Sequence, residues 1–153
     1  MRIHLLAIGQ RPPAWVSDGF EDYVRRLPPP LRPQLEVLPP TRRRDDLTRA
    51  RREETDRLLA RAPAAARLIA LDERGASWST QELAGQLAEW QQAGQAVALL
   101  IGGADGLALE RAAGAQRWSL SRLTLPHALV RVVIAEQLYR AWSILQHHPY
   151  HRE

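Results

Sequence analysis

Short apolar runs alternate with longer amphipathic segments along this chain. The apolar runs, each of a length typical of a strand, cover residues 3–8, 34–38, 67–72, 97–101 and 120–125. Apolar positions at helical spacing fill the intervals at residues 14–27, 46–62, 79–94, 107–115 and 127–146. Strands that alternate with helices predict an α/β fold with a mainly parallel sheet and helices on both faces. We expect residues 1–153 to form a single domain, because this length is enough for one hydrophobic core.

Local signals indicate where several of these elements begin and end. Pro12 and Pro13 precede the first helix, and Ser79 with Glu82 predicts a capping box at the start of the third, which Gly94 ends. We expect a turn at residues 73–75. The helical residues expected to face the core are Trp15, Phe20, Tyr23, Val24, Leu27, Leu47, Leu58, Leu59, Ala62, Leu83, Leu87 and Trp90.

The last helix, at residues 127–146, has apolar side chains on almost every side. It contains no glycine or proline, and one narrow polar stripe holds Glu136, Arg140, Ser143 and His147. A helix that is apolar all round is buried all round, and the sheet of a short chain covers only part of it. We therefore expect a homodimer in which a second chain covers the rest.

Arg131 points away from that polar stripe, among Ala135, Leu138 and Trp142. An unpaired charge is costly to bury. We expect Arg131 to have a partner, which is either a carboxylate or a phosphate across a subunit interface.

The run at residues 97–101 is apolar throughout and is followed by Gly102, Gly103 and Gly106. A continuous apolar run is typical of a central parallel strand, and glycines at its carboxyl end let a ligand approach the backbone. The Rossmann glycine pattern is not met, and a P-loop is excluded because the chain has no lysine.

Composition narrows the remaining classes of function. The formal charge of +4 fits a nucleic-acid partner, although many soluble proteins share it. The absence of cysteine excludes disulfides, a thiolate nucleophile and Cys-ligated zinc. The absence of lysine excludes Schiff-base chemistry. We find neither a signal peptide nor an apolar run of membrane-spanning length, so we expect a cytoplasmic protein that does not enter a membrane.

Two polar segments allow more than one interpretation. Arginines at residues 42–67 alternate with acidic residues, which is typical of a solvated helix, and only residues 42–44 form a plausible phosphate patch. The histidines of the tail suggest a metal site, but Pro149 breaks the spacing that a helical site needs. We expect no metal.

Several ordered motifs together resemble one family, the large-subunit ribosomal RNA methyltransferase H family of the SPOUT RNA methyltransferases. The resemblance spans the whole chain. Two departures are visible: Ala104 and Asp105 stand where Pro-Glu is typical, and the arginine-rich segment matches no family pattern. The motifs are Leu-Leu-Ile-Gly-Gly at 99–103, Gly-Leu at 106–107, Trp-Ser-Leu-Ser at 118–121, Leu-Thr-Leu-Pro-His at 123–127, Leu-Val-Arg at 129–131, Ala-Glu at 135–136, Leu-Tyr-Arg-Ala-Trp at 138–142 and His-Pro-Tyr-His at 148–151.

The resemblance implies a fold, an activity and partners. The fold would include a C-terminal trefoil knot involving residues 99–146, although general rules of topology disfavour knots. The activity would be S-adenosylmethionine-dependent methylation of N3 of a pseudouridine in the helix 69 loop of 23S ribosomal RNA, by a homodimer, on the assembled ribosome.

The resemblance also implies site residues. His127 either faces the reacting base or caps the last helix, and it is a catalytic candidate together with Tyr150 and His151. The cofactor-binding residues would be Leu71, Gly102, Gly103, Leu120, Ser121, Arg122, Leu123, Thr124 and Leu125. The RNA-binding residues would be Arg131, Glu136, Arg140, Tyr150, His151 and Arg152, with Tyr150 available to stack on a base.

A non-catalytic ribosome- or RNA-binding module on the same fold is the alternative. The intact pair Gly102 and Gly103 and the motif at 123–127 favour the enzyme.

Overall fold

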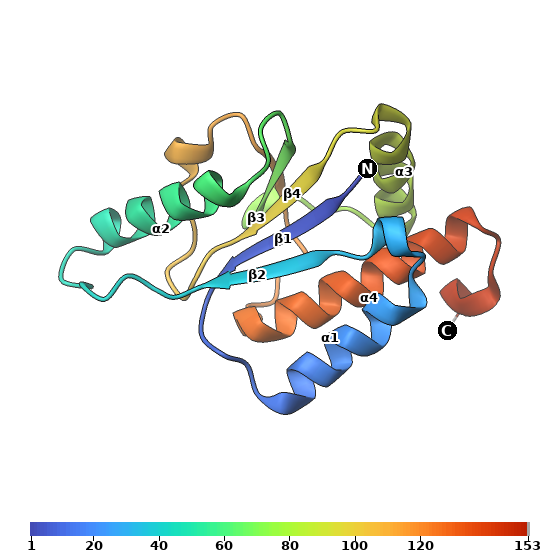
Figure 1. Ribbon diagram of the computed structural model, residues 1–153, viewed down its shortest axis with the longest axis horizontal. Coiled ribbons are helices and arrows are strands. Elements are labelled where there is room, and N and C mark those ends of the chain that lie inside the picture. The colour runs from blue at the N-terminus through green and yellow to red at the C-terminus, as the bar shows by residue number, and fades with distance from the viewer. Residues whose placement is uncertain (153) are drawn as a thin grey trace.

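The computed structural model describes residues 1–152, and their strands form a five-stranded sheet (Figure 1). The strand order is β2-β1-β4-β3-β5, and every neighbouring pair is parallel. The prediction of a parallel sheet is therefore confirmed. The strands are β1 (Ile3–Ile8), β2 (Gln34–Leu38), β3 (Arg67–Ala76), β4 (Val97–Ile101) and β5 (Gln116–Trp118).

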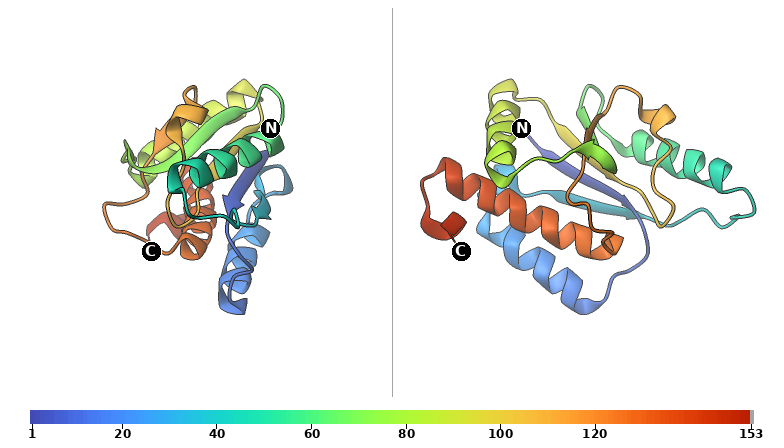
Figure 2. Two further views of the ribbon diagram at one scale, coloured as in Figure 1. Left: turned by 90° about the vertical axis from the view of Figure 1, so that its left-hand side faces the viewer. Right: turned by 180° about the vertical axis from the view of Figure 1, so that it is seen from behind.

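Helices cover both faces of this sheet, as predicted (Figures 1 and 2). On one face, α1 (Ala14–Arg26), α3 (Thr80–Ala93) and α4 (His127–Leu145) enclose the larger core, and α4 packs against both α1 and α3. On the other face, α2 (Leu47–Arg61) and the short 3-10 helix η2 (Leu109–Ala112) enclose a smaller core. Two further 3-10 helices, η1 (Pro29–Leu31) and η3 (Pro149–Arg152), follow α1 and α4.

The centre of the sheet is β4, whose five residues are all buried. It lies between β1 and β3, in register Ala7 with Ile101 and Ala70 with Leu100. Because all five strands are parallel, their carboxyl ends meet at one edge of the sheet. Any site built after several strands must therefore lie at that edge.

The predicted ends of α3 are confirmed in atomic detail. The Ser79 hydroxyl accepts the Glu82 N–H at 3.1 Å, and the Glu82 carboxylate accepts the Ser79 N–H at 2.9 Å, which completes the capping box. At the other end Gly94 adopts a left-handed φ of 67°, a conformation that favours glycine.

Two of the residues predicted to face the core are exposed. Trp15 is 63% exposed and Leu47 is 46% exposed, and both lie in the first turn of a helix. In α1 the buried side chains begin at Val16, which keeps the helical spacing with Phe20. In α2 the first turns project beyond the ends of the strands (Figure 1), and Leu47 is the first residue of that helix.

Three predicted elements differ in the structure. Residues 73–75 do not form a turn that ends the strand, because β3 continues to Ala76 with a shift of register against β5. The helix predicted at 107–115 is only the four residues of η2. The strand predicted at 120–125 is wrong, since β5 occupies residues 116–118 and the chain then continues as a loop to α4. The trefoil knot stays a prediction.

Two leucines on α2 test this assignment of the core. Leu58 is fully buried and Leu47 is largely exposed. Leu58→Ala should lower the free energy of unfolding by about 2–5 kcal/mol, because it leaves a cavity, whereas Leu47→Ala should change it by no more than about 0.5 kcal/mol. Urea unfolding of the two variants measures both values. Equal losses would contradict the orientation of α2.

Candidate functional site

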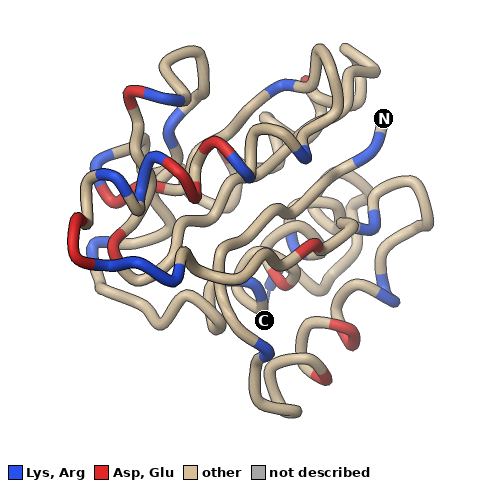
Figure 3. The backbone as a smooth tube through the Cα atoms, turned by 60° about the vertical axis from the view of Figure 1, so that its left-hand side comes forward, with Lys and Arg blue, Asp and Glu red and all other residues tan. Residues whose placement is uncertain are grey.

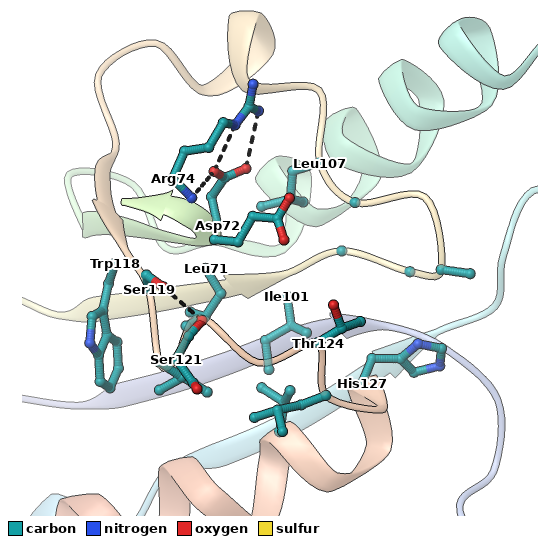
Figure 4. Close-up of a pocket in the computed structure, with 18 of the residues that line it drawn as sticks. Leu71, Asp72, Arg74, Ile101, Leu107, Trp118, Ser119, Ser121, Thr124 and His127 are labelled. Carbon is teal, nitrogen blue, oxygen red and sulfur yellow. Dashed lines mark hydrogen bonds and ion pairs between the residues drawn. The ribbon is translucent and has the colours of Figure 1, made fainter. Parts of the chain in front are cut away.

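A cavity of about 500 Å³ lies at the carboxyl ends of β3 and β4 (Figure 4). Three segments far apart in the sequence supply most of its lining: residues 71–74 of β3, residues 101–107 at and after the end of β4, and residues between 118 and 130, from β5 to the first turn of α4. Arg51 of α2 also lines it. A cavity of this size is typical of sites for small molecules.

The first wall is the glycine loop, which we define as residues 102–106. It folds back on itself, since the Gly106 N–H donates to the Gly103 carbonyl at 3.0 Å. A Cβ atom on Gly102 would lie 2.5 Å from the Gly106 carbonyl carbon, and Gly106 itself has a φ of 78°. The tight turn thus requires glycine at both positions and exposes backbone groups to the cavity.

The second wall is the loop at residues 119–125, where the sequence predicted a strand. Serine side chains, in place of a neighbouring strand, form hydrogen bonds with its backbone groups. The Ser119 hydroxyl donates to the Ser121 carbonyl at 3.2 Å, and the Ser121 hydroxyl accepts the Leu123 N–H at 2.9 Å. Serine side chains that bond to nearby backbone compete with strand pairing, and the two serines were the sequence signal for this loop.

The cavity brings together most of the residues predicted to bind a cofactor. Leu71, Gly102 and Gly103 line it, and so do Leu120, Ser121, Leu123, Thr124 and Leu125. Arg122 is exposed and does not line it. Asp72, Ile101 and Trp118 also line it, although they were not predicted from the sequence.

A fixed carboxylate lies at the rim of the cavity. Asp72 accepts the Arg74 backbone N–H at 2.8 Å and pairs with the Arg74 guanidinium at 3.1 Å (Figure 4). Burial alone would raise the pKa of Asp72, but these hydrogen bonds and the arginine charge hold that pKa below its usual value. Asp72 is therefore ionised at neutral pH.

His127 is the predicted catalytic candidate that lies in the cavity (Figure 4). It is the first residue of α4, and no side chain caps the start of that helix. The side-chain cap predicted for His127 is therefore not formed, and its role in facing the reacting base stays a prediction.

The predicted RNA-binding residues lie along α4 and beyond its far end. Glu136 accepts from Arg140 Nε at 2.8 Å and from the Tyr150 hydroxyl at 3.2 Å. The Tyr150 ring packs on Tyr139, with ring centroids 4.6 Å apart. Tyr150 thus lies beside Glu136 and Tyr139, which are nine and twelve residues beyond His127 on α4, a rise of about 14–18 Å along the helix. Tyr150, His151 and Arg152 therefore do not reach the cavity of their own chain.

Arg131 is buried, as predicted, with 1% of its surface exposed. Its Nε and Nη1 atoms have no hydrogen-bond partner among residues 1–152, and burial lowers its pKa. A small cavity of about 70 Å³, lined partly by Ser17 and Glu21, lies beside it.

The arginines of residues 42–67, whose positions Figure 3 shows, have more varied partners than the predicted i,i+4 pairs. Only Arg49 and Glu53 form an i,i+4 pair on α2, at 3.1 Å, while Arg52 and Arg61 pair with residues outside the helix. Two polar residues of α2, Glu54 and Thr55, are buried, and this was not predicted from the sequence. Their spacing from Leu58, at i−4 and i−3, was the available signal.

In the part of the chain that the structure describes, no three His, Asp or Glu side chains are grouped to hold a metal ion. No helix in the same region is long and apolar enough to span a membrane.

Comparisons with known proteins agree on one family. A family model described as "Predicted SPOUT methyltransferase" matches residues 1–151. The chain is 52% identical over 157 residues to a ribosomal RNA large subunit methyltransferase H from Nitrosococcus oceani and 50% identical over 155 residues to one from Paraburkholderia xenovorans. Each match covers 99% of both chains. The fold is similar to that of a methylase family protein from Neisseria gonorrhoeae, with a TM-score of 0.51 and 18% identity, over 90% of this chain and 81% of that chain.

The tight glycine loop gives a direct test of the cavity wall. A Cβ on Gly102 would overlap the Gly106 backbone, whereas a Cβ on Gly114 would meet nothing within 4 Å. Gly102→Ala should lower the free energy of unfolding by about 1–3 kcal/mol through overpacking, and Gly114→Ala should change it by less than about 1 kcal/mol. Chemical denaturation of the two variants measures the difference. If Gly102→Ala is as stable as Gly114→Ala, the loop is not closed as described.

Proposed function

Because the chain belongs to the ribosomal RNA large subunit methyltransferase H family of the SPOUT methyltransferases, we propose that it methylates 23S ribosomal RNA. The acceptor is N3 of a pseudouridine in the helix 69 loop, and S-adenosylmethionine binds in the cavity after β4. Action on a ribosomal substrate would place the protein in the cytoplasm. The observation that supports this proposal most directly is the folded glycine loop facing the loop at residues 119–125 across a single cavity.

The cavity fits S-adenosylmethionine in size and in chemistry. Its volume of about 500 Å³ lies within the range of sites for ligands of this size. Gly102 and Gly103 leave room for the cofactor to contact the backbone, and Leu71, Ile101 and Leu120 supply apolar surface for a base and a methyl group.

When bound, S-adenosylmethionine supplies the methyl group from an already activated sulfonium, so no metal is required. The chain must then hold the acceptor nitrogen in line and manage one proton. His127 lies in the cavity at the start of α4, and its imidazole is the group that we assign to the N3 proton. The glycine loop and the loop at residues 119–125 exclude water from the cofactor side.

Tyr150 has a different part in this proposal. Burial, a hydrogen bond with Tyr23 and the nearby Glu136 charge all raise the pKa of Tyr150. Its phenol therefore stays protonated at neutral pH and does not act as a base. Its ring is available to stack on RNA, while His151 and Arg152 contact phosphate or a base edge.

The tail of one chain can reach only the cavity of a second chain. Within one chain Tyr150 packs beside Glu136 and Tyr139, about 14–18 Å along α4 from His127, and Tyr150 does not line the cavity. The proposed enzyme is therefore a homodimer in which the tail of each chain completes the cavity of its partner.

The partly exposed apolar side chains of α4 support this dimer. Val132, Val133 and Trp142 remain partly exposed although α1 and α3 pack against the helix. A second chain would cover them.

Cofactor binding and methyl transfer test the activity. The wild-type protein should bind S-adenosylmethionine in a calorimetric titration and methylate ribosomes in preference to free subunits or naked RNA. Gly102→Ala should weaken cofactor binding at least about tenfold, a loss of about 1.4 kcal/mol, and Gly114→Ala serves as the control. A folded protein that binds RNA but no cofactor would support the non-catalytic module instead.

A mixing experiment tests the shared site. One variant carries His151→Ala and Arg152→Ala, which leave the packing of Tyr150 on Tyr139 in place, and the other carries Gly102→Ala. Each should be nearly inactive alone. After exchange of chains the mixture should recover activity, because a mixed dimer joins an intact cavity to an intact tail. A 17.3 kDa species in sedimentation, or mixed dimers without recovered activity, would contradict the shared site.

A further inference from the structure

Glu54 is a buried carboxylate on the inner side of α2, with 2% of its surface exposed. Its Oε2 atom accepts the Thr41 N–H and an N–H of Arg44 Nη1, each at 2.9 Å. Its Oε1 atom has no hydrogen-bond partner among residues 1–152 and lies 3.9 Å from the position of a Cβ on Gly103. A buried carboxylate needs an opposite charge, and Arg44 supplies it.

Arg44 makes a second ion pair with its other terminal nitrogen. Nη2 donates to the Asp105 carboxylate, which belongs to the glycine loop and lies 61 positions away in the sequence. The planar guanidinium holds its N–H groups in a fixed fork, so a single arginine can bridge two carboxylates at a defined separation. Arg44 thus connects the glycine loop to the interior of α2.

A second contact fixes the chain just beyond the glycine loop. The Thr55 hydroxyl accepts the Ala108 N–H at 2.9 Å, and Thr55 is fully buried. Two neighbouring residues of α2 therefore hold this segment. Glu54 holds it through Arg44, which pairs with Asp105, and Thr55 holds it by a direct hydrogen bond to Ala108.

From this network we propose that Arg44 is a positioning residue for the cofactor pocket. It holds the glycine loop in the shape that binds the cofactor, by joining Asp105 to the buried Glu54. The inference rests on the proposed function, because it assumes that S-adenosylmethionine binds against residues 102–106.

The proposal also divides the arginine-rich segment into two parts. Arg42 and Arg43 are exposed and suited to contact phosphate. Arg44 is committed to two carboxylates, and its pairs with Asp105 and Glu54 raise its pKa. The phosphate patch predicted at residues 42–44 would therefore include only the first two arginines.

Calorimetry and steady-state kinetics on Arg44→Met test this role. Methionine keeps the apolar stem of the side chain and removes both ion pairs. The Kd for S-adenosylmethionine should rise at least about tenfold, while the KM for ribosomes should change less than about twofold. Arg49→Met is the matched control, because it removes the exposed ion pair with Glu53 on the same segment and should leave the cofactor Kd unchanged.

Variants of Asp105 separate positioning from general stability. Asp105→Asn should raise the cofactor Kd as Arg44→Met does, and the double variant should be no worse than the weaker binder of the two single variants, since both changes break one link. Asp105→Glu keeps the charge and should retain most of the affinity. Asp105 is partly exposed, so its variants provide the measurement if Arg44→Met does not fold.

The outcomes are distinguishable. A wild-type protein that binds no S-adenosylmethionine contradicts the proposed function and this inference with it. A wild-type protein that binds, with Arg44→Met and Asp105→Asn binding equally well, overturns this inference alone. A raised KM for ribosomes with an unchanged cofactor Kd also overturns it, because Arg44 would then act as a phosphate contact.

Discussion

The burial of β4 on both faces is the constraint on which the rest of the structure depends. All five of its residues are apolar and buried, so the strand offers no position for a functional side chain until it ends at Ile101. The neighbouring strands are parallel to it, and their carboxyl ends therefore meet at the same edge. The glycine loop, the end of β3 and the loop before α4 converge there and form the cavity. The location of the site thus follows from the direction of the strands, and side chains decide only its chemistry.

The regular elements could be predicted from the sequence because each has a strong local signal. The capping box of Ser79 and Glu82, the left-handed Gly94 and the apolar run of β4 all lie where the sequence placed them. The errors occur where local and tertiary signals compete. Leu123 belongs to an apolar run that suggests a strand, yet the backbone bonds to serine side chains and Leu123 stays exposed. Trp15 was predicted to belong to the buried stripe, but the spacing from Val16 to Phe20 decides which side of α1 is buried, and Trp15 is exposed.

The residues of the candidate site also fall into two groups: those that sequence motifs predict and those that depend on tertiary contacts. Motif resemblance was enough to select Leu71, Gly102 and most of residues 120–125, which the fold then brings to one cavity. It selected Tyr150, His151 and Arg152 equally well, although the packing of Tyr150 beside Glu136 and Tyr139 keeps the tail from the cavity of its own chain. No sequence rule could pair Arg44 with Asp105 across 61 positions, because that contact depends on how α2 lies against the loop after β4.

The position of β4 between β1 and β3 has a consequence for the order in which the chain folds. The first strand to be synthesised can pair with β2 early, but its other edge waits for residues 97–101, and so does the free edge of β3. Until those residues leave the ribosome, the edges of β1 and β3 that pair with β4 keep their N–H and C=O groups unpaired, and such edges favour association between nascent chains. Closing these long loops is also slow. The pairing of β4 with β1 and β3 determines where the site lies. The same pairing therefore ends the period in which the new chain is most prone to aggregate.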